Sequence, residues 1–354
     1  METAYNGALV GFCNPLLDIV ATVDAGSLEK YSLKTNDATL ATLQQTPLFK
    51  ELIETHRACL FPGGSGQNAL HGAQLLLPAN STVFIGAVGQ DKNADKLREA
   101  AKQAGLHTDY IVDNEKPTGT CALLITSGGN SMVADLSAAQ SYQLKHTQRP
   151  EAWSLVSIAS VIYVTGFFLA VSPETVRLVA LNALANKHQT FALNVSAPSV
   201  VASHKSELLE ILPLTDVLFG GSFEVQALCT ALGLPVDPVL LVKRLASWPK
   251  RNGSLPRLVV FTADNGGVVV GSGDADTVSM CDAGKESSRI VDMNGAGDAF
   301  VAGFLAMTMQ GFAVDLCVEA GVWMRSLVVQ RFGASYPDGP LSFEPQGLRP
   351  TASI

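Results

Sequence analysis

The chain has 354 residues, of which 47% are apolar, and its formal net charge is −8. This length exceeds the usual size of one hydrophobic core, so we expect one large domain with a smaller appendage, or two domains. The acidic balance, without any run of basic residues, argues against nucleic acid or an anionic membrane as a partner.

Short apolar runs alternate with helical patterns along most of the chain, which predicts an α/β domain with a mainly parallel sheet. The predicted strands span 8–12, 82–89, 161–167, 190–196, 216–220 and 257–263. The predicted helices lie near 66–77, 91–104, 173–186, 236–247, 297–310 and 314–330. In a parallel sheet, ligands bind beyond the C-terminal ends of the strands.

Two regions break this alternation. Residues 18–64 contain one early strand-like run followed by polar linkers and a helical segment. Residues 118–142 contain two strand-like runs around "SGGN", which is a hairpin signal. Both regions are expected to form a small β-rich lid over the main sheet.

Cysteines, histidines and apolar stretches give no sign of disulfides, zinc or a membrane. The six cysteines form no C-x-x-C pair, which favours reduced thiols in the cytoplasm, and the six histidines are equally scattered. The N-terminus lacks a basic region and Asp18 interrupts its apolar stretch, so we expect no signal peptide. Residues 152–173 carry no charge, but "VIYVTGF" within them is typical of a strand buried on both faces.

A late glycine-rich stretch, "DMNGAGDAFVAGF" from Asp292, lies between a strand-like run and a helical pattern. The first N–H groups of a helix have no partner within it and lie at the positive end of its dipole. Gly295 and Gly297 allow several of these groups to converge, which would form a receptor for an anion such as a phosphoryl group. The alternative is a tight turn in which Asp298 only satisfies the first turn.

The established phosphate-binding motifs do not account for this loop. G-x-G-x-x-G fails at Phe300, and the Walker pattern fails because Gly284-Lys285 is followed by Glu286. If the substrate is an alcohol, Asp298 could accept the hydroxyl proton while loop N–H groups hold the phosphoryl oxygens. The helix dipole is expected to lower the pKa of Asp298.

An early glycine pair precedes a predicted helix in "FPGGSGQN". Gly63 and Gly64 allow close backbone approach, and Ser65 and Asn68 supply polar groups at the helix start. Taken alone, a serine such as Ser65 is more often a simple helix cap. The whole cluster suits a ligand rich in hydroxyl groups.

A polar pair also follows the first predicted strand, in "GFCNPLLDIVATVD". An ionised Asp18 is an acceptor only, so it could take hydrogen bonds from two vicinal hydroxyls, with Asn14 nearby. The alternative for Asp18 is an ordinary carboxylate of a loop or an edge strand.

In this order, these segments resemble the ribokinase-type (PfkB) carbohydrate kinases over roughly residues 8–338. The resemblance is carried by "GFCNPLLDIVATVD", "GGSGQN", "TGTCALLI", "VADLSAAQSY", "GFFLAVSPE", "NVSAPS" and "DMNGAGDAFVAGFL". It implies a three-layer α/β/α ribokinase-like domain with a small β-rich lid. The implied large domain spans 1–16, 65–117 and 143–354, and the implied lid spans 17–64 and 118–142.

"NPLLD" together with "GFFLAVSPE" is typical of the family members that phosphorylate nucleosides rather than sugars. The resemblance therefore implies ATP-dependent phosphorylation of the adenosine 5′-hydroxyl to AMP, with Mg²⁺, in purine salvage, by a cytoplasmic monomer. It implies Asp298 as the base and Gly295, Ala296 and Gly297 as an anion hole. The implied substrate-binding residues are Asn14, Asp18, Gly63, Gly64, Ser65 and Asn68 for ribose, and Leu136, Ala138 and Phe168 for the base. The implied nucleotide-side residues are Thr262 and Asn294, with Glu224 acting on the metal through water.

Four positions depart from the family pattern. Gly221 replaces the Asn of an N-x-x-E motif tied to Mg²⁺ and phosphate, Asn130 replaces a phosphate-reaching Arg, Ser199 replaces a pocket Phe, and Asp264 replaces a Gly. Loss of a positive charge near a transferring phosphate could weaken the ATP site. Two alternatives therefore stay open: a kinase for another purine nucleoside or a sugar, and a nucleoside-binding homologue with weakened catalysis.

Overall fold

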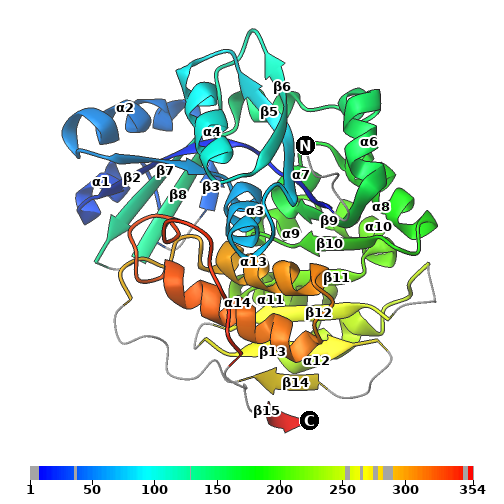
Figure 1. Ribbon diagram of the computed structural model, residues 1–354. Helices are drawn as coiled ribbons and strands as arrows, with labels where there is room; N and C mark the ends of the chain where they lie inside the picture. The colour runs from blue at the N-terminus through cyan, green and yellow to red at the C-terminus, as the bar shows by residue number, and fades with distance from the viewer. Residues whose placement is uncertain are drawn as a thin grey trace.

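The computed structural model describes residues 8–35, 38–127, 129–251, 256–263, 266–273, 278–281, 290–345 and 350–353. These residues fold into a ten-stranded sheet with helices on both faces and a separate five-stranded sheet beside it (Figure 1). The fold class predicted from the sequence, a three-layer α/β/α domain with a small β-rich lid, is confirmed.

The large sheet has the strand order β15-β14-β13-β12-β11-β10-β9-β1-β5-β6. The pairs from β6 to β12 are parallel and those from β12 to β15 are antiparallel, so the sheet is mainly parallel. Its strands are β1 (Ala8–Phe12), β5 (Thr82–Gly89), β6 (His107–Asp113), β9 (Ala159–Thr165), β10 (Thr190–Asn194), β11 (Val217–Gly220), β12 (Leu258–Thr262), β13 (Val268–Ser272), β14 (Val278–Cys281) and β15 (Pro350–Ser353).

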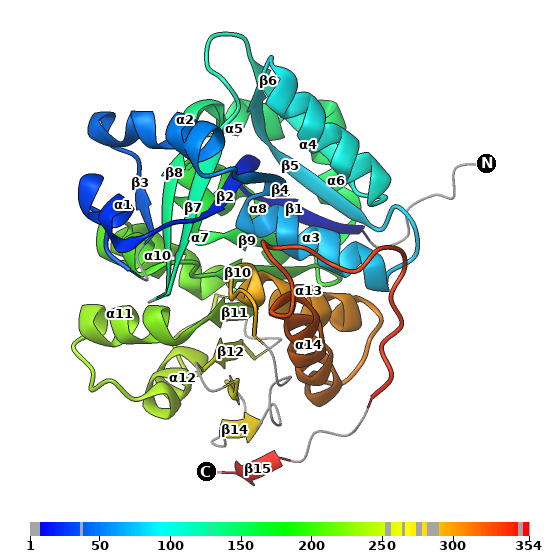
Figure 2. The same cartoon turned by 90° about the vertical axis from the view of Figure 1, so that its left-hand side faces the viewer.

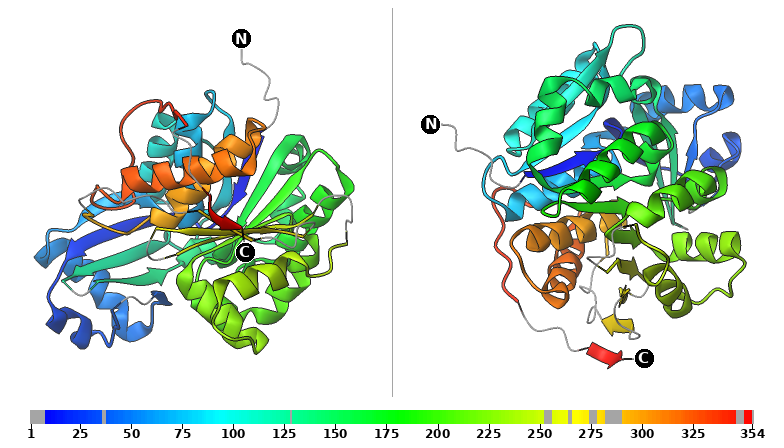
Figure 3. Two further views of the ribbon diagram at one scale, coloured as in Figure 1. Left: turned by 90° about the horizontal axis from the view of Figure 1, so that it is seen from below. Right: turned by 90° about the vertical axis from the view of Figure 1, so that its right-hand side faces the viewer.

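Two apolar clusters hold the helices on opposite faces of this sheet. Alternation along β1 sends Leu9 into one cluster and Val10 into the other. The Leu9 face carries α3 (Ser65–Leu76), α4 (Lys92–Gln103), α13 (Ala296–Met309) and α14 (Val314–Val328). The Val10 face carries α6 (Pro150–Ile158), α7 (Gly166–Leu169), α8 (Pro173–Ala185), α9 (Pro198–Ser203), α10 (Lys205–Ile211), α11 (Ser222–Leu232) and α12 (Pro238–Ala246), with α5 (Leu144–Thr147) beside α6. The left view of Figure 3 shows α13 and α14 in orange on one side of the yellow strands and green helices on the other.

The smaller sheet forms the lid and has the strand order β3-β8-β7-β2-β4. It draws on two separate parts of the chain: β2 (Leu16–Thr22), β3 (Ala38–Leu40) and β4 (Cys59–Gly63) from the first, and β7 (Thr120–Thr126) and β8 (Gly129–Asp135) from the second. The helices α1 (Ala25–Lys30) and α2 (Thr46–Thr55) pack on one face, and both lie on the far side of the lid from the large sheet in Figure 2. Three short 3₁₀ helices complete the described elements: η1 (Leu43–Gln45), η2 (Ser137–Ser141) and η3 (Leu212–Leu214).

The other face of the lid turns toward the large domain, and it carries Asp18. Because side chains alternate along β2, Asp18 shares this face with Leu16 and Val20. Those two residues pack with Ala139 and Phe332, which lie outside the lid strands. A carboxylate from the lid is therefore directed at the interface between the two sheets.

All six predicted strands and all six predicted helices are present, with ends within two residues of the prediction. The strand predicted over 161–167 instead begins at Ala159 and ends at Thr165, because Thr165 caps the short helix α7 through its hydroxyl. The hairpin predicted around "SGGN" is confirmed by the antiparallel pairing of β7 with β8. The exact domain boundaries stay predictions.

No helix among the described residues is long and apolar enough to cross a membrane. The uncharged stretch 152–173 is divided between α6, β9, α7 and the start of α8. Its apolar character therefore reflects burial inside the protein, as its sequence predicts.

Candidate active site

The early and late glycine loops meet at one carboxylate. Ser65 Oγ donates to Asp298 Oδ1 at 2.6 Å, and Asn68 Nδ2 donates to Asp298 Oδ2 at 2.9 Å. Ser65 and Asn68 lie on the first turn of α3, and Asp298 lies on the first turn of α13. The three predicted residues therefore form one cluster at the junction of two packed helices.

The backbone around Gly64 brings α3 to this position. β4 pairs with β2 up to Gly63, and the chain then turns through Gly64 at φ = 96° directly into α3. A side chain at Gly64 would place its Cβ 2.3 Å from the Asn14 carbonyl oxygen. Only glycine allows both this left-handed backbone and this close approach. The early glycine pair thus links the lid to α3, the helix whose Ser65 and Asn68 are hydrogen-bonded to Asp298.

The start of α13 has the form expected of an anion receptor. Gly295 precedes the helix with φ = 74°, and a Cβ at Gly297 would meet no atom within 4 Å. Within the described residues the N–H groups of Gly295 and Gly297 find no acceptor, whereas Ala296 N–H donates to the Met293 carbonyl at 3.2 Å. Unpaired N–H groups at a helix start favour a negatively charged ligand.

Burial raises the pKa of Asp298 to about 6, while the hydrogen bonds from Ser65 and Asn68 lower it. The expectation of a lowered pKa is therefore wrong. Removal from water disfavours the charged carboxylate more than the helix start and its two donors favour it. A carboxylate of this pKa is mostly ionised at neutral pH and is a stronger base than an exposed aspartate.

Asp18 and Gly63 lie against each other across β2 and β4. A Cβ at Gly63 would lie 2.1–2.3 Å from three atoms of the Asp18 carboxyl group, so only a glycine fits beside it. Burial, with a smaller contribution from the charge of Asp298, raises the pKa of Asp18 to about 8. Asn14 lies beside the other glycine of the early pair, Gly64; its Nδ2 donates to the Phe167 carbonyl at 3.3 Å and its Oδ1 finds no partner in the described structure. A buried, unpaired amide oxygen is the acceptor that a hydroxyl-rich ligand would satisfy.

The residues predicted to line a base pocket do not share one apolar cluster. Leu136 packs on the inner face of the lid with Leu16 and Phe61. Ala138 and Phe168 are fully buried, and the Phe168 ring packs at 5.2 Å from that of Tyr142 in the core of the large domain. Leu136 therefore lies on a surface that faces the interface, and the base-binding roles of all three stay predictions.

Thr262 lies at the end of β12, and Glu224 lies on α11 directly after β11. Thr262 Oγ1 donates to the Gly220 carbonyl at 3.5 Å, at the edge where parallel-sheet ligands bind. Gly221 N–H donates to Glu224 Oε2 at 2.8 Å, and a side chain at Gly221 would lie 2.9 Å from that oxygen. The missing Asn side chain thus leaves the space into which the Glu224 carboxylate turns to cap α11.

The other three positions that depart from the family pattern, and the predicted nucleotide-side residue Asn294, have different surroundings. Ser199 is exposed on α9, and Asp264 lies outside the described residues. Asn294 donates its N–H to Asp292 Oδ1 at 2.9 Å, while its Nδ2 finds no acceptor within the described residues. Asn130 donates its Nδ2 to the same Asp292 oxygen at 2.9 Å, so its side chain contacts protein where a phosphate-reaching Arg was expected.

Sequence reasoning missed two residues that support the site. Asp292 opens the late glycine loop and is buried, but nothing in its spacing marked it as a hub for hydrogen bonds. Cys13 is also buried, and its Sγ accepts Gly66 N–H at 3.0 Å and Thr165 Oγ1 at 3.2 Å. The direct adjacency of Cys13 to Asn14 was the only available signal.

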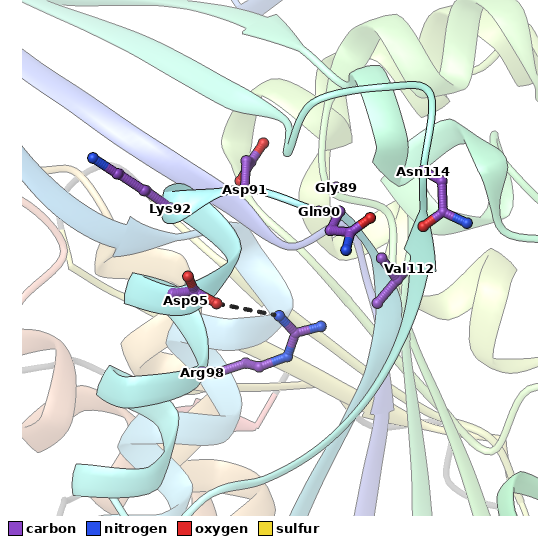
Figure 4. Close-up of a pocket in the computed structure, with 8 residues that line it drawn as sticks. All are labelled: Gly89, Gln90, Asp91, Lys92, Asp95, Arg98, Val112 and Asn114. Atoms are coloured by element: carbon purple, nitrogen blue, oxygen red, sulfur yellow. Dashed lines mark ion pairs between the residues drawn. The ribbon is translucent and has the colours of Figure 1, made fainter.

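A separate open pocket of about 520 Å³ lies at the start of α4 (Figure 4). Gly89, Asp91, Arg98 and Asn114 are among its lining residues, and Arg98 is directed toward Asp95 at 3.9 Å. None of the predicted site residues lines this pocket. It is therefore not part of the candidate active site.

The mainly parallel sheet, the β-sheet lid and the carboxylate beside an anion-binding helix start define a small-molecule kinase of ribokinase-like fold. Residues 25–339 match the model of the pfkB family carbohydrate kinases, and the chain belongs to this family. It is 37% identical to adenosine kinase 1 of Arabidopsis thaliana, covering 95% of this chain and 98% of that protein. It is also 37% identical to the adenosine kinase of Schizosaccharomyces pombe, covering 93% and 96% of the two chains.

Solved structures of similar proteins extend over nearly the whole chain. The adenosine kinase of Anopheles gambiae, solved with P1,P4-di(adenosine-5) tetraphosphate, has a TM-score of 0.92 at 39% identity and covers 96% of this chain and 99% of that chain. The adenosine kinase of Schistosoma mansoni, solved with 2-fluoroadenosine, has a TM-score of 0.90 at 27% identity, with coverage of 95% and 99%. Both the lid and the large domain are therefore shared with these enzymes.

Proposed function

We propose that this protein is an adenosine kinase, which transfers the γ-phosphoryl group of ATP to the 5′-hydroxyl of adenosine and forms AMP and ADP. The observation that carries the proposal is the pairing of Ser65 and Asn68 with Asp298, because it joins a hydroxyl-binding loop to a phosphate-binding helix start. The similarity to adenosine kinases over nearly full length supports adenosine as the acceptor.

The proposed mechanism is a direct transfer in one site. The 5′-hydroxyl gives its proton to Asp298, its oxygen forms the new bond to the γ-phosphorus, and the bond to the β,γ-bridging oxygen breaks to release ADP. The N–H groups of Gly295 and Gly297 face the phosphoryl oxygens, while Ala296 shapes the turn between them. Alignment and charge stabilisation contribute most of the rate in such transfers.

The adenosine itself would lie between the lid and the large domain. Asp18 and Asn14 would accept hydrogen bonds from the ribose hydroxyls, with Gly63 and Gly64 allowing the ribose close to the backbone. Leu136 would contact the base from the lid. The proposed pocket is consistent with the unpaired Asn14 Oδ1, which no protein donor satisfies in the described structure.

The residues present are compatible with Mg²⁺ held mainly by phosphate and water. Mg²⁺ typically uses one or two carboxylates together with substrate phosphates, and the described residues contain no cluster of three or more metal-binding side chains. Glu224 would act on it through water, although one of its oxygens accepts the Gly221 N–H. Bound Mg²⁺ would neutralise charge on the phosphates. Thr262 and Asn294 would contact the nucleotide.

One coupled assay tests the proposal. The purified protein is mixed with ATP and Mg²⁺ and with adenosine, other purine nucleosides or sugars; ADP, the product common to all acceptors, is followed through coupling enzymes, and AMP is measured directly in the adenosine reaction. We expect adenosine to be the preferred acceptor. Faster turnover of another acceptor would show that this acceptor, and not adenosine, is the preferred substrate. Adenosine binding without AMP formation would favour a nucleoside-binding homologue with weakened catalysis. The expected cytoplasmic monomer is tested by size-exclusion chromatography and cell fractionation.

A further inference from the structure

The lid contacts the late glycine loop through one side chain near its tip. Asn130 lies on β8, paired with Ile125 of β7 beside the turn of the hairpin. Its Nδ2 donates to Asp292 Oδ1 at 2.9 Å, across the boundary between the lid and the large domain. Among the described residues, Asn130 is thus the lid residue whose side chain is hydrogen-bonded to Asp292, at the start of the loop that leads into the anion-binding turn.

Asp292 in turn fixes that segment on several sides. Its carboxylate also accepts Asn294 N–H at 2.9 Å and Gly333 N–H at 3.0 Å, and only 4% of the residue is exposed. Its own N–H, together with that of Val291, donates to the Val329 carbonyl at the end of α14. A buried carboxylate with several donors holds its surroundings firmly, because each lost donor leaves charge without compensation.

A second lid contact reaches the same part of the large domain. The Phe61 ring on β4 lies 6.4 Å from that of Phe332, and a Cβ at Gly333 would lie 3.0 Å from the Phe61 ring. Gly333 is also a donor to Asp292. The lid thus touches the Asp292 network from two strands, by a hydrogen bond at Asn130 and by ring packing at Phe61.

We propose that Asn130 is a positioning residue for phosphoryl transfer, which ties the lid to Asp292 and thereby aligns the N–H groups of Gly295 and Gly297. This inference rests on the proposed kinase activity. It gives the Arg-to-Asn departure a physical role: Asn130 supplies no charge to the phosphate, and instead couples the position of the lid to the shape of the anion-binding turn.

The test compares three variants, Asn130→Ala, Asn130→Asp and Asn130→Gln. The control is Asn114→Ala, because Asn114 carries an exposed amide in the separate 520 Å³ pocket. If the energy of a hydrogen bond to a charged group is lost from the transition state, the rate constant falls by a factor of about 10 to 100. We expect Asn130→Ala to lower kcat by about that factor, with a much smaller change in KM for adenosine, and to raise the ratio of ADP to AMP formed. Asn130→Asp is expected to lower kcat further, because two carboxylates would face each other. Asn130→Gln keeps a donor and should recover part of the loss, and Asn114→Ala should match the wild type.

A readout independent of activity separates this inference from the proposed function. Hydrogen exchange of the peptide spanning 290–300 should speed up in Asn130→Ala and not in Asn114→Ala, with melting temperatures measured alongside to exclude global unfolding. If the wild type makes no AMP, the proposed function fails while the exchange result still decides the coupling. Unchanged exchange, or unchanged kcat and ADP-to-AMP ratio in Asn130→Ala, overturns the role of Asn130.

Discussion

Ser65 Oγ lies 2.6 Å from Asp298 Oδ1, although the two residues are 233 positions apart in the chain. The helix start that carries Ser65 continues from the lid strand β4, and the helix start that carries Asp298 follows the anion-binding turn. The bond therefore joins the two halves of the candidate site, and it fixes the carboxylate while leaving it a base.

Replacement of Asp298 by Asn should abolish most phosphoryl transfer. The amide keeps the shape but cannot accept the hydroxyl proton, and general-base catalysis typically contributes about 10²- to 10⁴-fold. We expect kcat to fall by about that factor, with adenosine affinity largely retained in calorimetry. Asp315→Asn, at the exposed first turn of α14, is the matched control. Near wild-type turnover of Asp298→Asn would show that the base has been assigned wrongly.

The pH dependence of kcat at saturating adenosine should report the titration of Asp298, because the bound nucleoside removes the contribution of Asp18. Because burial raises this pKa to about 6, the rate should fall as the pH drops below about 6 and the carboxylate takes up a proton. The Ser65 hydrogen bond lowers the pKa, so Ser65→Ala should move the acid limb to higher pH, whereas the exposed Ser154→Ala should not. An acid limb that stays in place in Ser65→Ala contradicts this account.

Gly297→Ala tests the anion-binding turn without disturbing the fold. The added methyl group meets no protein atom within 4 Å. It would project beside the Gly297 N–H group that we assign to the phosphoryl oxygens. We expect the free energy of unfolding to change by no more than about 1 kcal/mol, while KM for ATP rises or kcat falls at least tenfold. Gly26→Ala at the start of α1 is the matched control, since its nearest neighbour would lie at 3.4 Å. Full activity in Gly297→Ala would show that the phosphoryl group does not bind at this turn.

Adenosine affinity should increase with pH through the titration of Asp18. Its pKa of about 8 means that the ligand-free protein keeps this carboxyl protonated at neutral pH. Two ribose hydroxyls donating to the carboxylate favour its charged form, so binding should release a proton. Calorimetry in buffers of different ionisation enthalpy, between pH 6 and 9, measures both effects. Equal affinity for adenosine and 2′,3′-dideoxyadenosine would refute the ribose contact.

Asp18→Asn should stabilise the protein even though it weakens binding. The folded state holds the Asp18 proton up to a pH of about 8, compared with 3.8 for the ordinary group, so the free energy of unfolding falls as the pH rises between these values. Asn removes that dependence, and the gain in melting temperature should therefore be small near pH 4 and largest near pH 8. A gain that is independent of pH would indicate a packing effect instead.

Local sequence determined the elements and the candidate loops of this protein. The strand at 82–89 follows from a short continuous apolar run, the hairpin near "SGGN" follows from its turn residues, and the glycines around Asp298 mark the anion-binding turn. These features depend on residues within about one helical turn or one strand of each other, so neighbouring positions suffice to predict them.

Only the tertiary structure decided what each polar side chain contacts. The direction of the Asp298 pKa shift depends on burial by elements from distant parts of the chain, and local reasoning from the helix dipole gave the opposite sign. Likewise, Asn130 could be identified as a lost arginine, but its bond to Asp292 depends on how the lid meets the large domain. Burial and long-range pairing are set by the packing of the whole chain, and no local pattern encodes them.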